Sequence, residues 1–216
     1  MNAIEIKNLK KYFSKTKAVD GVSLNILQGE IFGFLGPNGA GKTTTIRCIM
    51  DFIRPDSGSV KILGLDAQKD SVRLKEKIGY LPSDVRLYDN WTGKNHIDFT
   101  RRIHHKKDIA SDLVKQLSLN TKVLFKNLSS GNKQKLALVL ALMNQPEIII
   151  LDEPTAGLDP ILQNTVYEIL EKLQREGTTI FMSSHNLSEV EKICSRVAII
   201  KEGKIVTIEN VQELLN

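Results

Sequence analysis

Residues 36–43 have the sequence GPNGAGKT, which is Gly36-Pro37-Asn38-Gly39-Ala40-Gly41-Lys42-Thr43, and they indicate the fold of this chain. It matches the pattern GxxxxGK followed by Ser or Thr in full. Its glycines allow a tight backbone turn, so several N–H groups can point at one phosphate. A helix that starts near Gly41 adds its positive end. We expect Lys42 to bridge the β- and γ-phosphates of a nucleotide, Thr43 to bind Mg²⁺ and Thr44 to contact a phosphate. A glycine-rich turn that matches by chance is the alternative.

The segments around this stretch have the order that a phosphate cradle requires. Residues 30–35 form a short apolar run that predicts a buried strand, and apolar residues at helical spacing follow the glycines. Residues 148–151 are an unbroken apolar run, typical of a parallel strand covered on both faces. Because strands alternate with helices, the sequence predicts a three-layer α/β domain with a mostly parallel sheet. Residues from about 92 to 145 look helical throughout, and we interpret them as a subdomain inserted between sheet strands.

Two acidic residues follow the apolar run at residues 148–151. Asp152 stands at the predicted carboxyl end of that strand, the edge at which open α/β sheets bind ligands, and a carboxylate there can hold Mg²⁺. We expect Glu153 to face the γ-phosphate and to polarise or deprotonate the attacking water. The alternative is a pair of surface carboxylates, but an acid pair beside a phosphate cradle has an obvious magnesium-ATP role.

The composition is that of an ordinary soluble globular chain. Of 216 residues, 41% are hydrophobic and 25% are charged, which supports a sizeable core without a disulfide or metal staple. Cys48 and Cys194 are far apart, so we expect free thiols in a reducing cytosol, with Cys194 in a packing role. The first residues contain no signal core, and no apolar stretch is long enough to span a bilayer. A net charge of +5 suits an anionic partner, without choosing among membrane, nucleic acid and nucleotide.

Further segments follow the cradle in a specific order, and they carry a family resemblance. In chain order they are Gly36 to Thr44, LSSGNKQ at residues 128–134, LDEP at 151–154, GLD at 157–159 and Ser184-His185. Together they make the chain similar to the nucleotide-binding domain of ABC transporters over nearly its whole length.

The resemblance implies a P-loop NTPase fold of the α/β class. This fold has a mostly parallel central sheet, an N-terminal antiparallel β part and an inserted α-helical subdomain. A single domain over residues 1–216 is then expected, with a core of residues 1–91 and 146–216 and a helical subdomain of residues 92–145.

The resemblance also implies cofactors and partners. ATP and Mg²⁺ are the expected cofactors, and two ATP molecules are sandwiched in a head-to-tail dimer of identical or different nucleotide-binding subunits. Separately encoded transmembrane subunits complete the transporter, so we expect this chain to lie peripherally at the cytoplasmic face of the cell membrane. No nucleic-acid partner is expected.

Five residues receive roles from the resemblance alone. Ser129 and Gly131 match residues that touch the γ-phosphate bound by the other subunit, although Ser129 is also a plausible helix cap. His185 aligns with the switch histidine that contacts the γ-phosphate, although a lone histidine is more often structural. Asp159 matches an acidic residue that communicates across the dimer, and it also suits a helix N-cap. Tyr12 matches the adenine-stacking aromatic, with the neighbouring phenylalanine as a competitor and a core role as the alternative.

The sequence departs from the family pattern at three positions. Ser83 replaces a glutamine that touches Mg²⁺ or the attacking water, and Ser130 and Asn132 alter the usual LSGGQ signature. A serine at position 83 needs a bridging water to act similarly. These changes leave the phosphate and magnesium residues intact but put the hydrolysis rate and the coupling in doubt. The pairing of YLPS at residues 80–83 with residues 128–134 resembles a bacterial exporter subfamily with ABC-2-type membrane subunits.

The motifs are consistent with one leading function and two alternatives. The first is the ATP-binding and ATP-hydrolysing subunit of a transporter, and the second is a non-transport ABC ATPase in a regulatory, DNA or ribosome complex. The third, a P-loop kinase or GTPase, leaves residues 128–134 without a purpose. A basic cluster at residues 101–107 is interpreted as a solvated loop, with lipid headgroups or a membrane subunit as alternative contacts. A metal site at its adjacent histidines is not expected.

Overall fold

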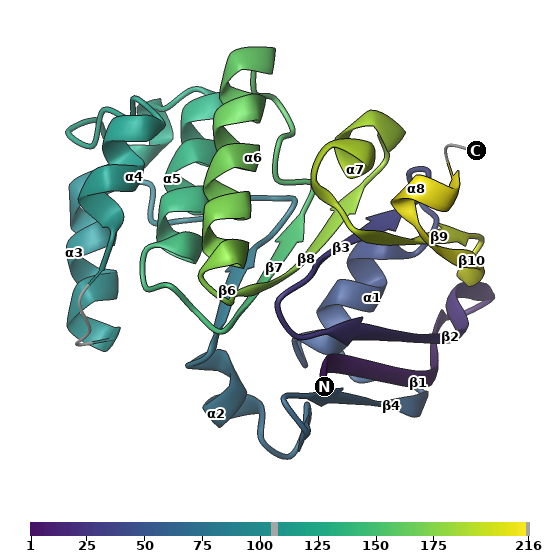
Figure 1. Ribbon diagram of the computed structural model, residues 1–216. Coiled ribbons are helices and arrows are strands. Elements are labelled where there is room, and N and C mark those ends of the chain that lie inside the picture. Colours follow the sequence, from purple (N-terminus) through teal and green to yellow (C-terminus); the bar gives the residue numbers. More distant parts are fainter. Residues whose placement is uncertain (105–107, 215–216) are drawn as a thin grey trace.

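The computed structural model describes residues 1–104 and 108–214 and contains two β-sheets with helices between and around them (Figure 1). The strands are β1 (Asn2–Phe13), β2 (Thr16–Leu27), β3 (Ile31–Leu35), β4 (Ser57–Ile62), β5 (Leu65–Asp66), β6 (Ile78–Leu81), β7 (Ile148–Asp152), β8 (Thr179–Ser184), β9 (Arg196–Lys201) and β10 (Lys204–Asn210). The helices are α1 (Lys42–Ile49), α2 (Ser71–Lys75), α3 (Gly93–His104), α4 (Ala110–Gln116), the 3-10 turn η1 (Phe125–Asn127), α5 (Ser130–Leu142), α6 (Pro160–Arg175), α7 (Leu187–Ile193) and α8 (Val211–Leu214).

The central sheet is mostly parallel, as predicted. Its strand order is β10-β9-β3-β8-β7-β6, and β9, β3, β8, β7 and β6 pair in parallel, while β10 joins β9 as an antiparallel hairpin. The second sheet, in the order β2-β1-β4-β5, is antiparallel. The predicted fold class, with an N-terminal antiparallel β part beside a parallel core, is therefore confirmed.

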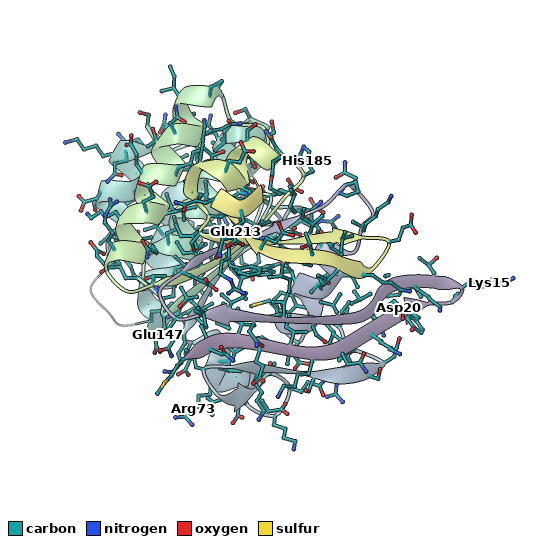
Figure 2. All side chains as sticks on the ribbon, turned by 45° about the vertical axis from the view of Figure 1, so that its right-hand side comes forward. Lys15, Asp20, Arg73, Glu147, His185 and Glu213 are labelled. Carbon is teal, nitrogen blue, oxygen red and sulfur yellow. The ribbon has the colours of Figure 1, made fainter. Side chains whose placement is uncertain are left out.

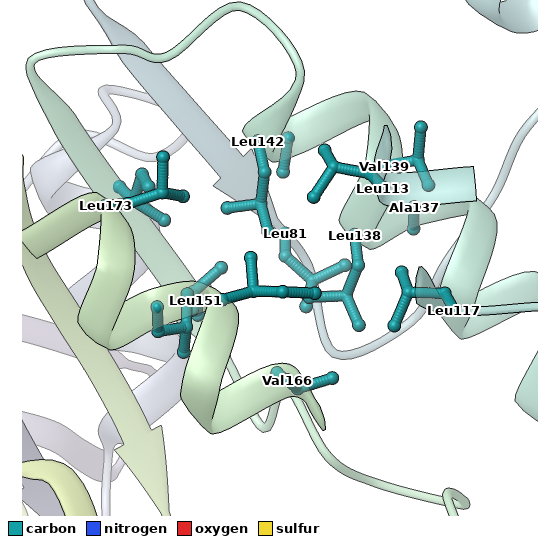
Figure 3. Close-up of a cluster of buried hydrophobic side chains, with 14 of the residues drawn as sticks. Leu81, Leu113, Leu117, Ala137, Leu138, Val139, Leu142, Leu151, Val166 and Leu173 are labelled. Carbon is teal, nitrogen blue, oxygen red and sulfur yellow. The ribbon is translucent and has the colours of Figure 1, made fainter. Parts of the chain in front are cut away.

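Both faces of the central sheet are covered, which explains why its inner strands are apolar without alternation. On β7, Ile149 and Leu151 pack with the helices α4 to α7, and Figure 3 shows part of this cluster. The intervening residues Ile148 and Ile150 face the opposite way and pack with α1 and the N-terminal sheet. Burial of these side chains contributes roughly 1.5–3 kcal/mol each.

Helices α3, α4 and α5 lie between β6 and β7 in the chain, at one end of the molecule in Figure 1. The expectation that residues 92–145 are helical throughout was wrong for the connection between α4 and α5. There Leu124 forms a strand-like bridge with Thr92, and the backbone N–H of Lys94 donates to the carbonyl of Thr121 at 2.8 Å. Tertiary pairing with the start of α3 thus replaces helical hydrogen bonds in this connection.

Helix α7 packs directly on strand β3. A Cβ placed on Gly33 would lie 2.9 Å from Val190 Cγ1 and 3.2 Å from Cys194 Sγ, so only glycine permits this approach. Cys194 is buried, and burial raises the pKa of its thiol, in keeping with the packing role expected from the sequence. Cys48 is also buried and free. Within the described residues, no helix is both long and apolar enough to cross a membrane.

Candidate active site

The carboxyl ends of the parallel strands bring the predicted site residues together. The pairing register sets Leu35 of β3 beside Ser184 of β8, and Ser183 beside Asp152 of β7. The chain leaves each strand at this edge, and the next residues are Gly36, Glu153 and His185. Segments far apart in the sequence therefore meet at one rim, because parallel strands end on the same side.

The glycine-rich stretch turns from β3 into α1 around an open cavity of ≈ 680 Å³. Gly39 and Gly41 have φ values of 80° and 108°, a left-handed conformation in which other residues are strained. A Cβ on Gly36 would lie 2.4 Å from the carbonyl oxygen of Ile200, so the turn also packs tightly from behind. The cavity is lined by Lys15, Thr16, Lys17, Ala18, Pro37, Asn38, Gly39, Gly41, Lys42, Thr43, Thr44, Ser83, Glu153 and Glu202.

Lys42 is held at the floor of the cavity by three oxygen atoms. Its Nζ donates to the carbonyl oxygens of Gly36 at 2.6 Å and Pro37 at 3.3 Å, and it lies 3.2 Å from Glu153 Oε1. The side chain is only 6% exposed. A buried ammonium group needs such partners, and the phosphates of a nucleotide can replace the carboxylate as its counter-charge.

Thr43 and Asp152 provide two adjacent oxygen donors that fit Mg²⁺. Thr43 Oγ1 donates to Asp152 Oδ2 at 2.7 Å, and Ser183 Oγ donates to Asp152 Oδ1 at 2.6 Å. Hard oxygen ligands suit this ion, which usually takes few from protein and the rest from phosphates and water. The described residues form no group of three or more acidic, His or Cys side chains able to hold a metal. Thr43 and Asp152 have the donor chemistry that would suit a magnesium ion bound to a nucleotide.

Glu153 is aimed by an unusual backbone conformation. Its φ is 56°, in the left-handed region, and its N–H donates to Ser183 Oγ at 3.1 Å. From this position one carboxylate oxygen meets Lys42, and the other lies 2.8 Å from Nδ1 of His185. Non-glycine residues in this region carry strain that the surroundings must offset, and such strain clusters at active sites. Lys42 and Glu153 line the cavity, and His185 contacts Glu153 from beside it.

The segment at residues 128–134 begins helix α5, and none of its residues lines this cavity. Ser129 is the N-cap, and its Oγ accepts from the backbone N–H of Asn132 at 3.3 Å. Neither Ser129 nor Gly131 lines the cavity around Lys42. Within one chain, the structure does not bring these two residues to the phosphate cradle.

Comparison with known proteins decides the family. The sequence pattern described as ABC transporter matches residues 19–156 of this chain. This chain belongs to the ABC transporter family. It is therefore an ATP-binding and ATP-hydrolysing subunit of an ABC transporter, as the sequence predicted.

Relatives and solved structures agree with this assignment. The bacitracin transport ATP-binding protein BcrA of Bacillus licheniformis is 39% identical over 208 residues, which cover 94% of this chain and 68% of that protein. The linearmycin resistance ATP-binding protein LnrL of Bacillus subtilis (strain 168) is 34% identical over 95% of this chain and 68% of its own length. The structure of an ATP-binding subunit of an ABC transporter superposes with a TM-score of 0.90 at 25% identity, covering 98% of this chain and 91% of that one. A dimeric bacterial ABC transporter cassette reaches 0.88 at 26% identity, covering 96% and 98%.

Asp159 and Tyr12 are also predicted residues that do not line the cavity of this ABC ATPase. Asp159 is the N-cap of α6, where its Oδ1 accepts from the N–H groups of Ile161 and Leu162 at 3.1 and 3.0 Å. Tyr12 does not line the cavity; its hydroxyl donates to Asp20 at 2.6 Å, and this bond raises the pKa of the phenol. Residues 15–18 of the β1–β2 hairpin line the cavity, and Lys15 lies at the tip of this hairpin (Figure 2). Stacking by Tyr12 stays a prediction.

Sequence reasoning assigned no role to two features that the structure places at the ABC site. Gln134 is 6% exposed, and its Nε2 donates to the backbone oxygens of Glu153 at 3.2 Å and Pro154 at 2.9 Å. Its place in the LSSGNKQ segment was the available signal. Glu202 lines the cavity from the β9–β10 hairpin, and nothing in the sequence indicated this.

The basic cluster divides into a described and an undescribed part. Arg101 donates to both carboxylate oxygens of Asp108, at 2.7 and 3.1 Å, and pairs with Asp98. The cluster is therefore partly neutralised by its own subdomain. Residues 105–107 lie outside the described residues, so the interpretation of the cluster as a solvated loop, with lipid or a membrane subunit as alternative contacts, stays a prediction.

Proposed function

We propose that this ABC ATPase is the motor subunit of an exporter and that two cassettes close around two molecules of Mg-ATP. Export is supported by the names of the relatives, which include proteins for bacitracin transport and Nod factor export. Dimer closure is supported by one observation above all. Ser129 and Gly131, which the resemblance assigns to the γ-phosphate, do not line the cavity with Lys42 and Glu153, which supports their arrival from a second cassette.

The proposed mechanism begins with a change of partner at Lys42. Phosphate oxygens take the place of the Glu153 carboxylate at Lys42 Nζ, which frees Glu153 to turn toward a water molecule. Thr43 and Asp152 would hold Mg²⁺, which neutralises negative charge on the phosphates. Glu153 then accepts a proton from the attacking water, whose oxygen bonds to the γ-phosphorus as the bond to the β–γ bridging oxygen breaks and ADP leaves. His185 orients the γ-phosphate from the end of β8 during this step. Separation of the products reopens the dimer, which then no longer pulls on the membrane subunits.

A mixing experiment tests the composite site. Lys42→Ala removes the phosphate contact of its own cradle, and Ser129→Arg removes the contribution of the signature segment to the other cassette. Each variant alone is expected to be inactive. An equal mixture should regain about a quarter of the wild-type ATPase rate, because half of its dimers are mixed and each mixed dimer has one complete site.

The control for the mixture is Ser111→Arg, an exposed serine on α4 far from the cradle, which should keep full activity. An inactive mixture of two folded variants would contradict the composite site. Copurification of the chain from native membranes, followed by identification of the bound proteins, tests the proposed position at the cytoplasmic face. Recovery with a DNA or ribosome complex and no membrane subunit would favour the non-transport alternative.

A further inference from the structure

A buried carboxylate joins the two loops that carry Glu153 and His185. Glu189 of α7 is only 9% exposed. Its Oε1 accepts from Thr155 Oγ1 and its Oε2 accepts from Ser184 Oγ, both at 2.6 Å. Thr155 and Ser184 are themselves buried. One side chain therefore receives a short hydrogen bond from each loop.

Each hydroxyl stands next to a residue of the proposed machinery. Thr155 follows Glu153 by two positions, and Ser184 directly precedes His185. Ser184 Oγ also accepts from the backbone N–H of Asn186 at 2.9 Å, so the turn around His185 is fixed on both sides. The chain Thr155–Glu189–Ser184 thus closes a path between the two loops behind the 2.8 Å contact of Glu153 with His185.

Local helix chemistry does not account for the position of Glu189. Asn186 is the N-cap of α7, which makes Glu189 the third helical residue, where a glutamate ordinarily accepts from the N-cap backbone N–H. Here that N–H donates to Ser184 instead, and Glu189 turns inward. The Glu189 carboxylate therefore lies between the two loops, and not at the capping position that a glutamate usually takes at this place in a helix.

The energetics also argue for a positional role. Each carboxyl oxygen of Glu189 accepts from one hydroxyl, so the two oxygens fix the positions of Thr155 and Ser184 relative to each other. Among the described residues, no Lys, Arg or His forms an ion pair with Glu189, so its burial is offset by neutral hydrogen bonds alone. Buried charge of this kind is a costly way to gain stability, whereas it defines geometry sharply.

We propose that Glu189 is a positioning residue that sets Glu153 and His185 relative to each other and to the attacking water. The proposal rests on the roles assigned above to Glu153 and His185. It assigns to Glu189 no contact with the nucleotide, because the side chain lies behind the loops and does not line the cavity.

Steady-state kinetics of Glu189→Gln provide the test, because the substitution keeps the shape but removes one of the two acceptor oxygens. We expect kcat to fall by about 10- to 100-fold, the effect of a small misplacement of reacting groups. The KM for ATP and the affinity for ADP should stay within about twofold of wild type, because the cradle is untouched. The matched control is Glu191→Gln on the same helix, which should leave kcat unchanged.

A second variant separates positioning from general stability. Thr155→Val keeps the size of the side chain and replaces only the hydroxyl. The variant should therefore show the same loss of kcat, while its unfolding temperature stays above the temperature of the assay. Ser184→Ala should lower kcat in the wild-type background but add little to His185→Ala, because its effect passes through His185.

The proposal is overturned if folded Glu189→Gln and Thr155→Val turn over ATP at the wild-type rate, or if kcat falls only in proportion to unfolded protein. These outcomes differ from failure of the proposed site. If Glu153→Gln and His185→Ala keep full activity, the roles of Glu153 and His185 fail before Glu189 is considered.

Discussion

Glu153→Gln should tighten nucleotide binding while abolishing turnover, because Glu153 is the counter-charge of Lys42. Their charged atoms are 3.2 Å apart, and the two side chains are 6% and 17% exposed. At an effective dielectric constant of about 20, two unit charges at this distance attract by about 5 kcal/mol. Desolvation cancels much of this attraction, so the net contribution of the pair is about 1.5–3 kcal/mol.

A nucleotide must displace this carboxylate from Lys42 before its phosphates can bind there. Glutamine removes the competing charge, and Lys42 keeps its bonds to the carbonyls of Gly36 and Pro37. The Kd for ATP should therefore fall by about 10- to 100-fold, the equivalent of the net pair energy. The Kd for ADP should fall as well, since the displacement does not depend on the γ-phosphate or on dimer closure.

Isothermal titration of ATP and ADP, alongside ATPase assays, measures both effects. The control is His185→Ala, which removes the other partner of Glu153 but leaves its charge on Lys42, and which should not tighten ADP binding. Glu153→Gln protein that binds ADP no better than wild type would refute competition at Lys42. Wild-type turnover in that variant would refute the assignment of Glu153 as the general base.

Three further outcomes are expected. Gly36→Ala forces a Cβ to within 2.4 Å of the carbonyl oxygen of Ile200. It should lower the free energy of unfolding by about 1–3 kcal/mol, measured by thermal unfolding, and weaken ATP binding, measured by titration. Gln134→Leu leaves the backbone carbonyls of Glu153 and Pro154, in the loop after β7, without their donor. It should lower the free energy of unfolding by about 1–3 kcal/mol, measured by chemical denaturation. Asp108→Asn removes the ion pair with Arg101, which holds the pKa of Asp108 below its ordinary value. The stability difference, about 1 kcal/mol, should be full at neutral pH and vanish as pH falls through that lowered pKa; a difference that persists in strong acid would contradict it.

The local chemistry of the site was readable from short stretches of sequence. The cradle at residues 36–43, the acid pair after the apolar run, and the N-caps Ser129 and Asp159 depend on contacts within a few positions. Apolar runs predicted the inner strands because both sheet faces are covered. The boundaries of the helical subdomain and the roles of the site residues stay predictions.

Contacts between distant segments could not be read in this way. Gln134 reaches the loop after β7, and Tyr12 bonds to Asp20 outside the cavity, because strand pairing and helix packing place them there. The helical expectation for the connection between α4 and α5 failed for the same reason, since pairing with Thr92 outweighs local preference.

The sequence alone placed this chain among ABC ATPases and predicted nucleotide binding at a glycine-rich turn, because tight turns, phosphate contacts and strand ends need particular residues in a short order. Only the tertiary structure decided which side chains share the site. It turned Glu189 inward between Thr155 and Ser184, paired Lys42 with Glu153, and left Ser129 outside the cavity. The physical reason is that hydrogen bonds and charge pairs act over a few ångströms in space, whatever the separation along the chain.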